Sequence, residues 1–230
     1  LTARLRRLSP DPLVQVLLVG WAFSCLVEGL AGFGTPAALA APILVGLGFP
    51  PVRAAAACLV MNTIPVVFGA VGTPLWFGLG ELELPRESLL EIGRRAAVVQ
   101  VVAAPVVVAL ALRLLMPWRT IVRGAGPIVL VVGATVGASW AVAGRSLEFP
   151  SIAGGLAGLA AGLGAARTMG RRGGASGTKA DEDADADGEP SEAAGPAAPS
   201  LARAATPLLL TVLILALTRI EAIGLQPLLT

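Results

Sequence analysis

The sequence predicts an all-α, polytopic transmembrane protein with broken or re-entrant helices, and three observations lead to this fold class. The chain of 230 residues is 55% hydrophobic and 14% charged, whereas soluble domains carry about 25% charged residues. Between Pro12 and Gly80 the only charged side chains are Glu28 and Arg53, so this region is typical of several membrane spans. Glycines and prolines interrupt the apolar stretches, which predicts that some of the helices are broken.

The apolar stretches predict the helices in order. The stretch 36–49 is only fourteen residues long, short of the ~20 that a span needs, so it either re-enters the membrane or is continued by its flanks. Residues 80–95 are predicted to form a charged loop and residues 117–123 a short basic one, and Pro105 is expected to kink the helix between them. The predicted apolar segments are 13–27, 36–49, 54–78 (itself interrupted), 96–116, 126–143 and 151–166.

Composition divides the chain into three parts. Residues 1–166 are expected to form a transmembrane region, and residues 204–230 the start of a further membrane segment. Residues 167–203 are rich in acidic and small residues, which predicts a disordered linker. Arginines in short loops mark the cytoplasmic side of a membrane, and their distribution puts the N-terminus, the 117–123 loop and the linker in the cytoplasm. The chain begins without Met and ends just after an apolar stretch, so we expect it to be a piece of a longer protein.

Glu28 is the residue around which the first apolar region is organised. A charge at the centre of a bilayer costs about 2.5 to 3.5 kcal/mol. Glycines follow Glu28 at positions 29, 32 and 34, and each weakens a helix by roughly 1 kcal/mol, so we expect the helix to unwind at Glu28. Thr35 is then predicted to cap the next helix, with Pro36 as its first residue. Transporters build mid-membrane sites from such breaks; the alternative is a kinked helix whose acid has no function.

The tripeptide Gly-Thr-Pro at residues 34–36 recurs at residues 72–74. A helix N-terminus carries about half a positive charge and unpaired N–H groups. Two such helix starts in one cavity, at Thr35 and Thr73, would therefore suit a carboxylate ligand. The alternative is a chance recurrence in a chain rich in glycine and proline.

Asn62 and Thr63 interrupt the third apolar stretch just ahead of Pro65. Their side chains and the carbonyl groups freed by the proline could contact a ligand or an ion. Hydrogen bonding between helices is the alternative role.

Several functional classes are excluded or unsupported. The chain contains no His, which excludes a histidine proton relay and histidine metal ligands. Cys25 and Cys58 lack metal-type spacing and are expected to be small buried side chains. Residues 32–37 match a loose dinucleotide-binding pattern, but no βαβ unit surrounds them. We therefore expect no enzyme activity, no cofactor, no metal and no nucleic-acid partner.

Three blocks, at residues 27–36, 44–49 and 62–70, together resemble the bacterial L-lactate permease family in order and spacing, and residues 203–217 resemble it weakly. The resemblance implies a multi-pass carrier of the bacterial cell inner membrane that moves L-lactate or glycolate together with protons. Members of that family are much longer than this chain.

Within that resemblance Glu28 is the expected proton-coupling group, because a carboxyl in apolar surroundings can carry a proton and this block has no other acid. The alternative functions are transport of another small organic or inorganic anion, or a role as a membrane scaffold subunit without transport. The residues expected along the substrate and ion pathway are Glu28, Gly32, Gly34, Thr35, Asn62, Thr63, Gly72 and Thr73.

Overall fold

The computed structural model describes Ser9 and residues 11–173, and every regular element in this part of the chain is helical. Three of its helices are long and apolar enough to cross a membrane: Pro12–Leu30, Arg86–Leu115 and Ala125–Ala143. The predicted class of an all-α, polytopic membrane protein is therefore confirmed.

The first of these helices is the enclosed centre of the bundle. It consists of α2 (Pro12–Val16), a π-helical segment η1 (Leu17–Phe23) and α3 (Ser24–Leu30), which follow one another without a gap. The Asp11 carboxylate accepts a hydrogen bond of 2.8 Å from the backbone N–H of Leu13 and so caps the helix start. The apolar part of this helix is 83% buried, against 28% for each of the other two long helices, because neighbours pack around it.

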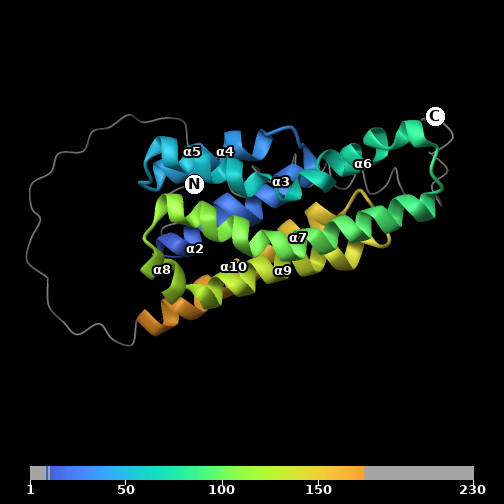
Figure 1. The fold of residues 1–230 in the computed structure, drawn as a ribbon. Coiled ribbons are helices and arrows are strands. Elements are labelled where there is room, and N and C mark those ends of the chain that lie inside the picture. The colour runs from blue at the N-terminus through green and yellow to red at the C-terminus, as the bar shows by residue number, and fades with distance from the viewer. Residues whose placement is uncertain (1–8, 10, 174–230) are drawn as a thin grey trace, which may run out of the picture. The chain divides into compact units, whose positions relative to one another are not determined.

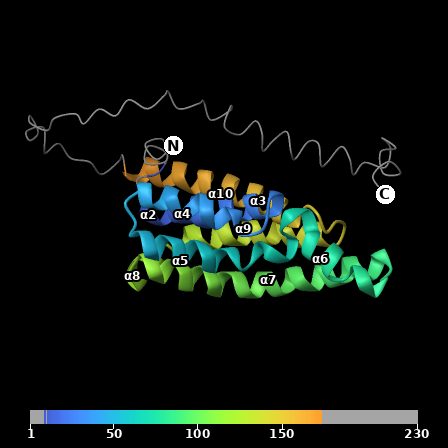
Figure 2. The same ribbon diagram turned by 90° about the horizontal axis from the view of Figure 1, so that it is seen from above.

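Those neighbours run alongside the central helix (Figures 1 and 2). α4 (Thr35–Gly46) and α5 (Pro51–Asn62) pack on each other and on η1, α7 (Arg86–Leu115) packs on α5, and α9 (Ala125–Ala143) packs on α7. α10 (Pro150–Gly173) contacts both α9 and the central helix. Exposed apolar side chains on α7 and α9, such as Val102 and Val129 at 71% each, suit a lipid surface.

Two breaks interrupt the helices, as the sequence predicted. The first break, residues 31–34, joins α3 to α4 and has positive φ angles at Gly32, Phe33 and Gly34. The second break, residues 63–72, follows α5 and contains the short 3-10 turns η2 (Pro65–Phe68) and η3 (Ala70–Gly72). It leads into α6 (Thr73–Gly78) and a further turn, η4 (Gly80–Leu82).

Glycines on α10 let it pack closely on its neighbours. A Cβ atom built on Gly154 would lie 2.7 Å from the carbonyl oxygen of Thr135 on α9, and one on Gly162 would lie 2.5 Å from Leu18 on the central helix. Larger residues at these positions would push the helices apart.

Three predicted segments differ from the structure. The expected loop at 80–95 is helical from Arg86 onward, because α7 begins there and Glu91 forms ion pairs with Arg94 and Arg95, at helical spacing. The basic loop at 117–123 contains a short helix, α8 (Trp118–Arg123). α10 continues to Gly173, past the expected start of the linker at residue 167. The predictions for residues 174–203 and 204–230 lie outside the described residues.

The elements alternate in direction, so that α2, the turn at 47–50, α8 and the last turns of α10 gather at one end of the bundle (Figure 1). Arg53, Arg119 and Arg123 lie in or next to these segments, in agreement with the predicted clustering of arginines on one side. Which side of the membrane this end faces stays a prediction.

Candidate functional site

Glu28 is buried inside the bundle rather than placed in a loop. It lies on α3, two residues before the helix ends at Leu30, and is 2% exposed. The expectation that the helix unwinds at Glu28 was therefore wrong, because Gly29 is accommodated in the helix and the unusual φ angles begin at Gly32. At 1.5 Å per residue, Glu28 lies about 24 Å from the start of a helix about 28 Å long. The acid is thus near one end of this helix and not at its middle.

Asn62 is the partner of this acid. It is the last residue of α5, and its side-chain Nδ2 donates a hydrogen bond of 3.1 Å to Oε2 of Glu28. The amide oxygen of Asn62 is buried and has no hydrogen-bond partner among the described residues. An unpaired buried acceptor costs about 1 to 3 kcal/mol, which points to a group that this structure does not contain or to a second arrangement of the site.

Thr63, the next residue, lies away from this pair. Its side chain is exposed, and its hydroxyl donates a hydrogen bond of 2.8 Å to the carbonyl of Val60, one turn earlier. The structure therefore brings Asn62 to Glu28 but not Thr63.

The two breaks meet at the acid. A Cβ atom built on Gly69 would lie 2.5 Å from Oε1 of Glu28, and one on Gly32 would lie 2.8 Å from the Cβ of Ala70. Only glycine fits at these two positions without displacing its neighbours. The sequence analysis identified Gly32 but missed Gly69, and the available signal was its position four residues after Pro65, directly after the turn that this proline begins.

The two Gly-Thr-Pro segments do not cap their helices as expected. Gly34 (φ 79°) and Gly72 (φ 77°) take the left-handed conformation just before α4 and α6, so Thr35 and Thr73 are already helical and neither caps a helix with its side chain. The prediction of Thr35 as an N-cap was wrong, because glycine adopts this turn at little cost. The Thr73 hydroxyl instead donates to the carbonyl of Ala70.

These segments also differ in surroundings. Gly72 is buried, and a Cβ atom there would lie 2.5 Å from the carbonyl oxygen of Leu147, so it is a close-packing position. Gly34 is exposed, and Thr35 and Thr73 are half-buried. Because α6 has only six residues, its start offers an anion far less than the start of the twelve-residue α4.

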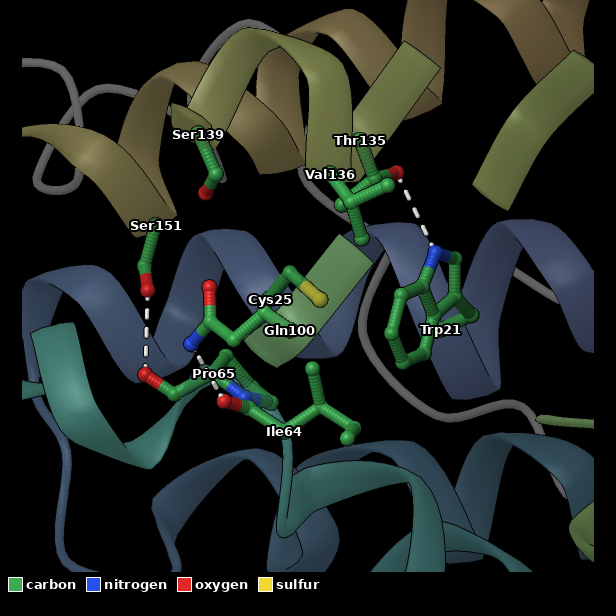
Figure 3. Close-up of a pocket in the computed structure, with 9 residues that line it drawn as sticks. All are labelled: Trp21, Cys25, Ile64, Pro65, Gln100, Thr135, Val136, Ser139 and Ser151. Atoms are coloured by element: carbon green, nitrogen blue, oxygen red, sulfur yellow. Dashed lines mark hydrogen bonds between the residues drawn. The ribbon is translucent and has the colours of Figure 1, made fainter. Parts of the chain in front are cut away.

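A small cavity lies beside the second break (Figure 3). Its volume of about 10 Å³ is the least that one water molecule needs. Nε2 of Gln100 donates a hydrogen bond of 2.6 Å to the carbonyl of Ile64, and the Ser151 hydroxyl donates one of 3.0 Å to that of Pro65. The backbone of the second break is thus held by side chains of α7 and α10. The lining residues are Trp21, Cys25, Ile64, Pro65, Gln100, Thr135, Val136, Ser139 and Ser151.

Helix α9 adds two further polar side chains to this cavity. The Thr135 hydroxyl accepts a hydrogen bond of 3.1 Å from the indole N–H of Trp21, and the Ser139 hydroxyl donates one of 2.7 Å to the carbonyl of Pro150. Sequence reasoning missed all of these polar residues. The available signal was weak: each is a single polar residue within an apolar segment, and only the fold brings them together.

The fold and this site define a polytopic membrane protein with broken helices and polar side chains buried between them. The family model for L-lactate permease matches residues 1–227. The chain belongs to the L-lactate permease family, a family of transporters and not of enzymes.

Named relatives agree with this assignment. A protein of Haemophilus influenzae, provisionally named as an L-lactate permease, is 47% identical over 151 residues, which cover 66% of this chain and 28% of that protein. The L-lactate permease and the glycolate permease GlcA of Escherichia coli are each 53% identical over 68 residues, covering 30% of this chain and 12% of each relative. The chain therefore matches less than a third of the length of these relatives. No solved structure matches the chain.

Proposed function

We propose that this chain is part of a secondary transporter that moves L-lactate, or a similar small 2-hydroxy monocarboxylate such as glycolate, across the bacterial inner membrane together with protons. The observation that carries the proposal is the pairing of Glu28 with Asn62 at the point where both breaks meet. A buried acid at a break in a membrane helix is a functional group by default.

Glu28 is the proposed proton carrier. The described residues offer it one amide donor and no cation, so its negative charge is only partly compensated. Taking up a proton removes that charge and changes what Asn62 can bond, because a protonated carboxyl donates one hydrogen bond where the ionised form only accepts. The unpaired amide oxygen of Asn62 is available to accept that bond if either side chain turns.

The second break is the proposed moving part. Gly69 of this segment lies directly against the carboxylate of Glu28. Any change in the side chain of Glu28 therefore acts on the segment directly. In transporters with alternating access, broken segments likewise move around a fixed binding site. Asn62, Gly32 and Gly69 are the residues most directly involved, and Gly72 and Thr73 at the second break are further pathway residues, whereas Gly34 and Thr35 at the exposed first break have little support. Thr63 has the least support.

The substrate is inferred from the relatives, whose names specify L-lactate and glycolate. Both are monocarboxylates with a hydroxyl on the neighbouring carbon. The choice between these and other anions is part of the proposal.

The test is uptake by the whole protein, reconstituted in proteoliposomes with an imposed pH gradient. We expect labelled lactate and glycolate to accumulate when the proton gradient is directed inward, and accumulation to stop when an ionophore collapses it. Succinate as the preferred substrate would favour a dicarboxylate carrier. Uptake of none of the three would favour a scaffold subunit.

A further inference from the structure

We propose that the polar cavity between the second break and helices α7, α9 and α10 is the binding site for the 2-hydroxy monocarboxylate. In this site the Ser139 and Ser151 hydroxyls hold the substrate carboxylate, and the amide oxygen of Gln100 accepts the hydrogen bond of the substrate hydroxyl. The inference rests on the function proposed above and adds to it the residues that recognise the substrate.

The cavity is built from polar side chains that are almost fully enclosed. Gln100 is 6% exposed, Thr135 3%, Ser139 5% and Ser151 2%. They come from three helices that are separate in sequence, yet they face the same space (Figure 3). Polar groups inside a membrane bundle are costly unless they are bonded, so four of them at one cavity is more than packing between apolar helices requires.

Gln100 supplies an acceptor that is still free for a ligand. Its Nε2 donates to the carbonyl of Ile64, while its Oε1 has no hydrogen bond to any of the described residues. Figure 3 shows this oxygen on the side away from Ile64, facing the space below Ser139. The cavity therefore contains several hydroxyl donors together with an amide oxygen that makes no hydrogen bond. A 2-hydroxy acid needs that combination, because its carboxylate accepts and its hydroxyl donates.

The donors are at present bonded to backbone carbonyls. The Ser151 hydroxyl donates to Pro65 and the Ser139 hydroxyl to Pro150. A carboxylate is the stronger acceptor, since hydrogen bonds to an ionised group are roughly twice as strong as neutral ones. A substrate carboxylate can therefore replace these carbonyls as the acceptor.

The wall formed by Ile64 and Pro65 is the part that must move. The present cavity of about 10 Å³ has space for about one water molecule, so this is a closed arrangement. The wall belongs to the second break, whose 3-10 turns have no continuous helical ladder to hold them. Displacing this segment opens the space and frees the donors of Gln100 and Ser151 in the same step.

Glu28 is close enough to link this site to protons. Cys25, which lines the cavity, lies one turn before Glu28 on α3, and Asn62 lies two residues before Ile64. Like charges repel more strongly in a site from which water is excluded. An ionised Glu28 therefore disfavours a substrate carboxylate in the cavity, and a proton on Glu28 removes this barrier.

The test compares pairs of acids that differ only in the hydroxyl: lactate with propionate, and glycolate with acetate. Inhibition of labelled lactate uptake by each acid is measured for the whole protein in proteoliposomes. Binding is measured in a second experiment, as the rise in the Tm of the purified protein when each acid is added. In the parent protein we expect the hydroxy acids to bind about tenfold more tightly than their partners, which corresponds to one additional hydrogen bond. In Gln100→Met, which keeps the side-chain length, this preference falls to about twofold or less.

Gln15→Met is the matched control. Gln15 is also buried, at 5% exposed, and its Nε2 also donates to a backbone carbonyl, that of Ser9, but it lies outside the cavity. This variant keeps the preference for hydroxy acids. If Gln100→Met does not fold, Ser139→Ala provides the test, and it weakens the hydroxy and the deoxy acid by the same several-fold factor.

The outcomes separate this inference from the function on which it rests. If the parent protein neither takes up nor binds lactate, the proposed function fails. If it does, and Gln100→Met retains the full preference for hydroxy acids, or Ser139→Ala binds both acids like the parent, the assignment of the cavity is wrong while the transport function stands.

Discussion

Each of the two breaks ends at the glycine of a Gly-Thr-Pro tripeptide, but the two breaks differ in what surrounds them. The first break is mostly exposed, with Phe33 85% exposed, and leads into the twelve-residue α4. The second break has buried residues at Pro65 and Gly69, and side chains from α7 and α10 hold its carbonyls. The first break is a tight turn set by glycine conformation, whereas the second is an unwound segment stabilised by other helices.

This difference shows where a ligand can gain binding energy. Carbonyls of an unwound segment inside a bundle must be bonded by something, so donors gather there and are available to a ligand when the segment moves. A glycine turn at the edge of the bundle needs no such partners. The same tripeptide therefore lies in two different hydrogen-bonding environments, and the second break is the better candidate for a ligand-binding site.

The largest effect is expected at Glu28, which the second break contacts. Glu28→Gln keeps the size and the hydrogen bonding to Asn62 but removes the titratable proton. We expect accumulation of lactate driven by a pH gradient to be abolished, while the protein still inserts in the membrane. Accumulation is measured in proteoliposomes, with Glu91→Gln, a change at the exposed end of α7, as a control that transports normally. Accumulation by Glu28→Gln at the parent level would remove Glu28 from the mechanism.

A pair of glycine variants compares the breaks directly. Gly69→Ala places a methyl group 2.5 Å from Oε1 of Glu28, an overlap that costs about 1 to 3 kcal/mol, and we expect it to reduce both Tm and lactate uptake. Gly34→Ala meets no atom within 4 Å but places alanine at φ 79°, at a cost of about 1 to 2 kcal/mol. This variant lowers Tm and leaves the substrate affinity of the folded protein unchanged. Equal effects of the two variants on affinity would contradict the distinction between the breaks.

Ser151→Ala removes one of the two bonds that hold the second break. The carbonyl of Pro65 loses its donor, and we expect a loss of about 1 kcal/mol in stability. Hydrogen exchange of residues 64–72 should rise while that of 31–38 stays the same. A rise of equal size in both segments would show that the breaks are not held separately.

The smallest effect is expected at Thr35. Thr35→Val keeps the size, and the lost hydroxyl makes no capping bond to the helix, so the change in stability stays within about 0.5 kcal/mol. Lactate affinity, measured by competition for uptake, should change less than twofold. A larger loss of affinity at unchanged Tm would show that the start of α4 binds the substrate after all.

Sequence alone predicted the helical membrane class and both breaks, and it selected Glu28 and Asn62 as candidates, because an acid and an amide stand out in apolar surroundings. It could not predict that Asn62 lies against Glu28, since no local pattern fixes contacts between segments 34 residues apart. Gln100, Ser139 and Ser151 were missed for the same reason. The spacing of Glu91, Arg94 and Arg95 indicated a helix at the start of α7. The high density of charged residues nevertheless led to the prediction of a loop.

The enclosure of the central helix also has a consequence for how the protein is made. Pro12–Leu30 is synthesised ahead of α5 and α10, the helices that bond its acid and cover its sides. Until Asn62 has been inserted, Glu28 has no amide donor, and its position near the helix end lets it reach the membrane surface while it waits. α10, which packs on this helix through its glycines, is synthesised later still. Among the described helices, Pro12–Leu30 is therefore the earliest to be synthesised and the latest to be fully enclosed.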